Sequence, residues 1–129
     1  MTESIILGEI DISALLKAQL TFQEALKEAD SPLTRDGTIQ RFEYTFELAW
    51  KTLKRVLKYN GVTVNSPRDT IRAAAKETYI DSPEEWFAFL EYRNNTVHTY
   101  NQDVAEEIFS HLPEFEGLVA TLIKRISKL

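Results

Sequence analysis

The 129-residue sequence contains no cysteine, which excludes a disulfide framework and any metal site built on thiolates. It has only four glycines and four prolines, too few for a β-sandwich with many tight turns or for a disordered chain. No apolar run reaches the roughly 18 residues that a membrane-spanning helix needs. We therefore expect a soluble, mainly helical protein of a reducing compartment, the cytoplasm, with no membrane contact.

The sequence also lacks an excess of positive charge. Fifteen Lys and Arg residues face 20 Asp and Glu residues, which gives a formal net charge of -5. A protein that binds duplex DNA usually carries a broad basic footprint, so any contact with nucleic acid is expected to be local. The N-terminus has no basic residue before its apolar part, and Glu9 and Asp11 interrupt that part, which argues against a signal peptide.

What the sequence does have is apolar residues at helical spacing, with no sustained alternation of apolar and polar residues. A chain of this length forms one compact core by default, so we predict a single domain over residues 1–129. The pattern predicts helices over about residues 9–29, 36–60, 66–77, from 82 up to the segment at 93, and from 100 to 126. Such an arrangement is typical of an all-α, antiparallel up-and-down four-helix bundle with an additional short helix.

Capping residues mark the expected helix ends. Ser31-Pro32 should end the first helix, and Asn60-Gly61 should close the second with a left-handed cap. Thr99-x-x-Gln102 forms a capping-box pattern for the last helix, with Asn101 as a competing N-cap. Pro113 lies inside that last helix and should kink it.

The segment RNNTVHTY, from Arg93 to Tyr100, holds one of only two histidines and is the strongest candidate for a site. On a continuous helix Arg93 and His98 would lie about 140° apart around the axis, too far to face one target. The four residues between them are mediocre helix formers and a new cap follows, so the helix is expected to break here. Arg93 starts from the buried side of its helix and therefore needs an anion.

Two interpretations of this arginine remain open. Glu43 and Glu47 form an i, i+4 acidic pair on the second helix, and either could neutralise Arg93 beside a capping histidine. Alternatively, the guanidinium binds an external phosphate. An imidazole at His98 could then take a proton from a ribose 2′-hydroxyl, which gives metal-free RNA cleavage. One histidine per chain supplies only one acid–base group, so this hypothesis needs a symmetric dimer with the motif at its interface.

The other candidates carry less chemistry. His111 lies within the last expected helix, next to Leu112, so we expect it to be either a structural residue or a solvated surface group. With no cysteine and no histidine pair at ligand spacing, we expect no metal or cofactor. The second helix carries a basic row at steps of three and four, Lys51, Lys54, Arg55 and Lys58, which is either a solvated face or a docking patch for an acidic partner or a phosphate. No glycine-rich phosphate loop or paired-aspartate motif occurs, so the chain is not expected to be a nucleotidyltransferase itself.

Two segments together resemble a known family. RFEYTFELAWK, from Arg41 to Lys51, and RNNTVHTYN, from Arg93 to Asn101, are similar to segments of the nucleotidyltransferase substrate-binding proteins of the HEPN superfamily. The resemblance covers about residues 5–129. The second segment fits the pattern R-x4-H-x-Y, with the polar residue Asn94 directly after the arginine.

The resemblance implies a four-helix bundle that forms a homodimer and binds a separately encoded minimal nucleotidyltransferase. It implies a substrate-binding or regulatory subunit that contacts nucleotide or RNA phosphate through the motif. In related toxin–antitoxin pairs the helical subunit is a metal-independent endoribonuclease, silenced when the nucleotidyltransferase adds AMP to the motif tyrosine. Carried over, the catalytic residues would be Arg93 and His98 and the AMP acceptor would be Tyr100. Besides these, we expect supporting roles for Asn94 and for the acidic pair Glu43 and Glu47.

Overall fold

A computed structural model describes residues 6–7 and 10–128 of the chain. Within that part the elements follow in the order β1 (Ile6–Leu7), β2 (Ile10–Asp11), α1 (Ser13–Glu28), α2 (Pro32–Tyr59), α3 (Pro67–Lys76), α4 (Pro83–Asn94), the 3-10 turn η1 (Asn95–His98) and α5 (Gln102–Ile126). The two short strands pair antiparallel, with Ile6 opposite Asp11. Among the helices described, none is both long and apolar enough to cross a membrane.

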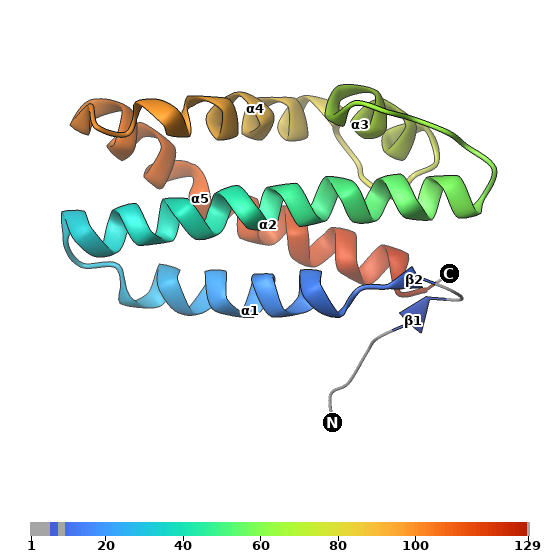
Figure 1. The fold of residues 1–129 in the computed structure, drawn as a ribbon, viewed down its shortest axis with the longest axis horizontal. Helices are drawn as coiled ribbons and strands as arrows, with labels where there is room; N and C mark the ends of the chain where they lie inside the picture. The colour runs from blue at the N-terminus through green and yellow to red at the C-terminus, as the bar shows by residue number, and fades with distance from the viewer. Residues whose placement is uncertain (1–5, 8–9, 129) are drawn as a thin grey trace.

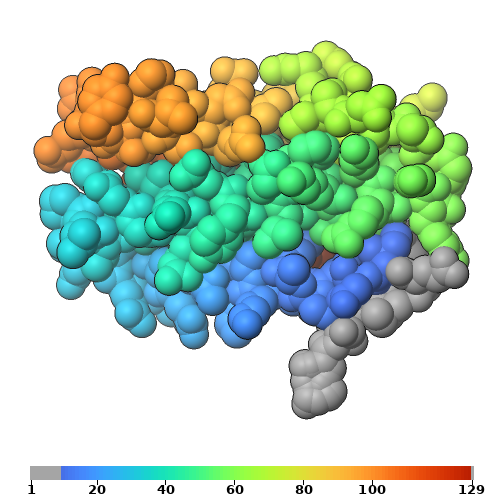
Figure 2. Space-filling view, in the orientation of Figure 1, coloured from blue at the N-terminus to red at the C-terminus, as the bar shows by residue number. Residues whose placement is uncertain are grey.

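The helices form the predicted bundle. Helix α1, helix α2 and the end-to-end pair α3 and α4 lie side by side, and α5 crosses behind α2 (Figure 1). Figure 2 shows the same face with side chains, where α1, α2 and the α3–α4 row form three adjacent bands. Helix α2 is the longest, with 28 residues, and it packs against every other helix. The all-α expectation is therefore confirmed, with α3 as the additional short helix.

An aromatic cluster joins the four long helices. The ring centroid of Phe115 on α5 lies 4.9 Å from that of Phe42 on α2 and 5.2 Å from that of Phe89 on α4. Phe22 of α1 meets the same ring edge-on at 5.9 Å. All four side chains are almost completely buried. Such a cluster combines burial of large apolar area with favourable edge-to-face geometry, so it fixes how the helices sit against one another.

The first two helices begin at other residues than the sequence predicts. Helix α1 begins at Ser13 rather than near residue 9, because Ile10 and Asp11 are extended in β2. Helix α2 begins at Pro32 rather than near residue 36. Ser31 is its N-cap and accepts a hydrogen bond from the backbone N–H of Thr34. A proline is favourable in the first turn of a helix, where its missing N–H costs nothing, so Ser31-Pro32 opens α2 instead of closing α1.

Two helices end in the same backbone motif. After α2, the N–H of Gly61 donates to the carbonyl of Lys58, and the N–H of Val62 donates to that of Leu57. After α3, Thr78 and Tyr79 donate to Ala75 and Ala74 in the same way. Both are Schellman caps, whose central residue adopts a left-handed conformation. The φ angle is 88° at Gly61, as predicted for that cap, and 65° at Thr78, where a side chain makes this conformation unfavourable.

The last helix begins with Asn101, not with the predicted capping box. The Asn101 side chain accepts hydrogen bonds from the backbone N–H groups of Asp103 and Val104. The hydroxyl of Thr99 instead donates to the carbonyl of Thr96 at 3.0 Å. Asn101 therefore caps the helix, because the Thr99 hydroxyl is already hydrogen-bonded to the preceding turn. Helix α5 continues through Pro113, and the kink there stays a prediction.

Candidate functional site

The RNNTVHTY segment breaks the helix as predicted. Helix α4 ends at Asn94 and the 3-10 turn η1 follows. The buried hydroxyl of Thr96 donates to the carbonyl of Arg93 at 2.8 Å, so a side chain satisfies a carbonyl at the helix end. Since Thr99 satisfies the carbonyl of Thr96 in turn, the segment forms a fixed turn rather than a continuation of α4.

Arg93 is held by an internal carboxylate. Its Nη2 forms an ion pair with Oε1 of Glu47 on α2, and its Nη1 donates to the side-chain oxygen of Asn94 at 3.3 Å. The second carboxylate oxygen of Glu47 lies 3.4 Å from the Lys51 ammonium. Two cations therefore share one carboxylate, and the structure shows the internal pairing of Arg93 that the sequence allowed for Glu47. Glu43 forms no ion pair among the residues described.

An open groove exposes this ion pair to solvent. It has a volume of about 310 Å³ and is lined by Gln40, Glu43, Tyr44, Glu47 and Arg93. The side chain of Arg93 keeps 35% of its surface exposed. A ligand in the groove would therefore meet the guanidinium directly, and an anion there would compete with Glu47 for it.

His98 and Tyr100 lie together on the surface. The Tyr100 hydroxyl is 3.4 Å from Nδ1 of His98, and the two rings meet edge-to-face with centroids 5.9 Å apart. Tyr100 is 84% exposed and the neighbouring Val97 is 71% exposed. Within the described residues, no hydrogen bond joins His98 to Arg93. One protomer thus pairs Arg93 with Glu47 and His98 with Tyr100.

The basic row on α2 has uneven partners. Lys51 pairs with Glu47, and Nη2 of Arg55 lies 3.5 Å from the hydroxyl of Thr52. Lys54 and Lys58 have no carboxylate within ion-pair distance in the described part of the chain. The row is therefore only partly compensated by the protein's own acids.

The second histidine belongs to the packing of α4 against α5. The His111 ring stacks on the Tyr92 ring with centroids 4.8 Å apart, and its Nε2 lies 3.2 Å from a carboxylate oxygen of Glu107. Burial raises the pKa of the Tyr92 hydroxyl, and the charge and hydrogen bond of Glu107 raise it further. The stacking on Tyr92 favours the structural role over the other expected possibility, a solvated surface group. Over residues 6–7 and 10–128, there is no group of three or more side chains suited to a metal ion.

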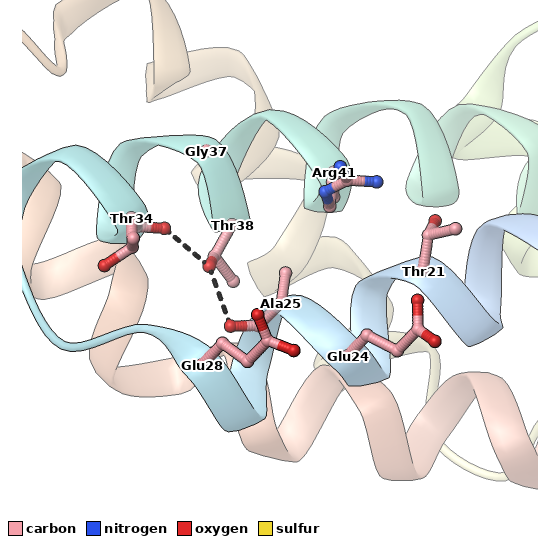
Figure 3. A pocket seen from close by; sticks show the side chains of 8 residues that line it. All are labelled: Thr21, Glu24, Ala25, Glu28, Thr34, Gly37, Thr38 and Arg41. Atoms are coloured by element: carbon pink, nitrogen blue, oxygen red, sulfur yellow. Dashed lines mark hydrogen bonds between the residues drawn. The ribbon is translucent and has the colours of Figure 1, made fainter.

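A second cavity, of about 300 Å³, lies between α1 and α2 and was not foreseen from the sequence. In Figure 3, Glu24 and Glu28 extend from α1 toward α2, and Arg41 lies across from them. The Thr38 hydroxyl lies in the cavity wall and bridges the two helices, with the carbonyl of Thr34 at 2.8 Å and that of Ala25 at 3.3 Å as its acceptors. The Arg41 guanidinium donates to the Tyr44 hydroxyl at 2.8 Å, so it also borders the groove of Arg93. The lining comes from two helices, so no local sequence pattern marks it.

The chain matches known proteins over nearly its whole length. Residues 10–128 match the profile of a family described as nucleotidyltransferase substrate binding protein like. A curated relative, the probable ribonuclease HepT of Haemophilus influenzae, is 31% identical over an alignment of 84 residues, and the match covers 61% of this chain and 58% of that protein. The chain therefore spans less than two thirds of the length of this relative.

Two solved structures share the fold. A protein of Thermus thermophilus superposes with a TM-score of 0.83 at 36% identity, covering 87% of this chain and 98% of that one. A Haemophilus influenzae protein, described as having the fold of a substrate binding domain of a nucleotidyltransferase, superposes with a TM-score of 0.80. Its identity is 23%, over 89% of this chain and 98% of that one, so this second likeness concerns the fold.

Proposed function

Because the chain belongs to the nucleotidyltransferase substrate-binding protein family, we propose that it is the helical substrate-binding or regulatory subunit of a two-component nucleotidyltransferase system. Its partner is a separately encoded minimal nucleotidyltransferase. The subunit acts as a homodimer and contacts nucleotide or RNA phosphate through Arg93, His98 and Tyr100. A fold presenting this motif without a phosphate-binding loop of its own suits a partner rather than a self-sufficient transferase.

The observation that carries this proposal is the exposure of the motif turn. Tyr100 and Val97 are large side chains left 84% and 71% exposed directly beside His98. The turn is nevertheless fixed by the Thr96 and Thr99 hydroxyls, so its shape does not depend on a ligand. Rigid turns with exposed aromatic and ionisable side chains are where proteins commonly place binding groups. The turn therefore supports recognition of a ligand or partner at this end of the bundle.

A second candidate function is metal-independent RNA cleavage, which the similarity to a probable ribonuclease favours. The imidazole of His98 would take the proton of a ribose 2′-hydroxyl, and the 2′-oxygen would attack the adjacent phosphorus. The P–O bond to the 5′-oxygen would break, leaving a 2′,3′-cyclic phosphate. The departing 5′-oxygen needs a proton, which the second copy's histidine would supply. Arg93 would stabilise the charge on the phosphate.

Modification of Tyr100 would regulate this activity. Its hydroxyl would attack the α-phosphorus of ATP on the partner enzyme, forming a Tyr–AMP bond and releasing pyrophosphate. The added phosphate would lie beside His98, because the unmodified hydroxyl is already 3.4 Å from Nδ1. An anion there would block RNA from the imidazole.

The decisive experiment co-expresses the chain with a minimal nucleotidyltransferase encoded next to it. A stable complex on size-exclusion chromatography, and AMP addition at Tyr100 by mass spectrometry, are the expected results. Tyr100→Phe should abolish the addition, whereas Tyr59→Phe, which alters another exposed tyrosine, should not. Two separate peaks and an unmodified chain would refute the partner role.

The cleavage alternative is tested with the partner-free protein and RNA in the presence of a metal chelator. We expect a 2′,3′-cyclic phosphate end that disappears in His98→Ala and Arg93→Ala. His111→Ala is the matched control, because it removes the other histidine and leaves the motif intact. A wild type that is inert at micromolar concentration would refute cleavage and favour the binding role.

A further inference from the structure

A row of lysines continues from the motif groove along α2. Glu47, Lys51, Lys54 and Lys58 recur at intervals of four, three and four residues, which places them on one side of the helix. The helix rises about 16 Å from Glu47 to Lys58. Figure 1 shows that this stretch of α2 passes from beside α4 to beside α3. Lys51, Lys54 and Lys58 are called the lysine stripe below.

The two lysines of the stripe farther from Arg93, Lys54 and Lys58, have no carboxylate partner among the described residues. Other cations nearby are already engaged: Arg68 pairs with Glu91 at 3.5 Å and Arg72 with Asp69 at 3.2 Å, and both guanidinium groups lie over the Phe87 ring. Lys54 and Lys58 have no such carboxylate in the part of the chain described. They stay uncompensated although the protein carries a net charge of -5. Cations left bare in this way gain most from a polyanion, which releases its condensed counterions on binding.

The stripe is physically connected to the motif. One oxygen of Glu47 pairs with Arg93 and the other with Lys51, so the first lysine of the stripe and the motif arginine share a carboxylate. At the far end, Tyr59 follows Lys58 directly and is 59% exposed. A line of cations with an exposed aromatic ring is typical of surfaces that bind single-stranded nucleic acid, where bases stack on the ring.

We propose that the lysine stripe binds the backbone of a single RNA strand and leads it to Arg93. The inference rests on the proposed function, since it takes RNA phosphate as the ligand of the motif. A narrow row about 16 Å long suits one flexible strand of a few nucleotides. It does not suit a duplex, which needs a broad basic footprint that the molecule lacks.

The test measures binding of a fluorescein-labelled dodecauridylate by fluorescence anisotropy. The variant Lys54→Glu/Lys58→Glu should weaken binding about tenfold or more at low salt, because two phosphate contacts become repulsive. In the milder variant Lys54→Gln/Lys58→Gln, the slope of log K against log salt should fall by about 1.4, the value for two lost contacts to a single strand. Thermal unfolding of both variants establishes that they remain folded.

The matched control is Lys17→Glu/Lys27→Glu, which alters two exposed lysines of α1 and changes the net charge equally. It should change affinity less than about twofold. Equal weakening by both glutamate pairs would overturn the stripe, because only overall charge would then matter. The proposal would also be overturned if Lys54→Glu/Lys58→Glu bound the dodecamer as well as the wild type but no longer formed the nucleotidyltransferase complex. The stripe would then be a contact surface for the protein partner.

Binding of AMP separates the stripe from the proposed function. AMP reaches only the motif, so Arg93→Ala should weaken it and the Lys54/Lys58 variants should not. If the wild type binds AMP but not the dodecamer, the role of the lysine stripe is refuted and the proposed role of the motif stands. A wild type that binds neither ligand refutes both.

Discussion

The two ends of the bundle are built differently. At the end formed by the C-terminus of α2 and the α3–α4 loop, side chains tie separate elements together. Asn60 donates to the Tyr79 hydroxyl at 2.8 Å, and Arg125 of α5 pairs with Asp81 at 2.7 Å. At the motif end, the bonds within η1 and its flanks are mostly local, and Leu33, Val97 and Tyr100 stay at least 71% exposed. Side-chain bonds therefore join separate elements at the first end, whereas the second end leaves several large apolar and aromatic side chains exposed.

The largest expected effect is on the free energy of unfolding, which tests whether the two ends differ in stability. Ile80 lies in the α3–α4 loop and is 3% exposed, so Ile80→Ala removes buried methyl groups and leaves a cavity. We expect the free energy of unfolding to fall by about 2–5 kcal/mol. Val97→Ala at the motif end should change it by no more than about 0.5 kcal/mol, because that side chain is 71% exposed. Urea denaturation of the two variants measures both values, and similar losses would show that the two ends do not differ.

The next largest effect concerns ligand binding at the motif end. Glu47→Gln removes the carboxylate that holds Arg93 and Lys51, so a phosphate no longer competes with it. We expect AMP to bind several-fold more tightly, about 1 kcal/mol in free energy. Isothermal titration calorimetry measures this.

Glu43→Gln is the control for that experiment. It removes one negative charge from the same groove, yet Glu43 forms no ion pair among the described residues. If both variants bind AMP equally well, the effect is one of general charge. If Glu47→Gln binds AMP more weakly than the wild type, Glu47 positions Arg93 rather than competing for it.

The smallest effect compares the two Schellman caps. Thr78 holds a left-handed φ of 65° that favours glycine, so Thr78→Gly should raise the free energy of unfolding by about 0.5–1 kcal/mol. Gly61→Ala, at φ 88°, should lower it by about 1 kcal/mol. Nothing lies within 4 Å of a methyl group added at Gly61, so conformation alone is tested. Thermal unfolding would contradict this account if both changes shifted stability in the same direction.

The sequence predicts the bundle well because its signals are local. Apolar residues at helical spacing define the buried faces, and Asn60-Gly61 marks a helix end that only glycine favours. The same locality explains the errors. Ser31-Pro32 can end one helix or open the next, and spacing alone does not decide between them. The hydroxyl of Thr99 could have capped α5, but a contact with Thr96 takes it.

The site was predicted only in part for a related reason. The break after Arg93 follows from poor helix formers, and pairing with Glu47 follows from an acidic residue on the expected neighbouring helix. The cavity between α1 and α2 depends on Glu24 and Arg41, which are distant in sequence and meet only in the folded chain. The proximity of His98 to Tyr100 likewise depends on the geometry of a 3-10 turn.

The tethered carboxylate of Glu47 also acts as a filter. Because it is attached to the same molecule, it faces Arg93 at a high effective concentration that no small free anion can match. Chloride and acetate each carry one negative charge, as the Glu47 carboxylate does, so their interaction with the guanidinium is no stronger than the existing ion pair. A ligand that brings more than one negative charge, such as a phosphate monoester, is expected to gain by displacing it. We therefore expect the groove to bind phosphate esters in preference to chloride or acetate.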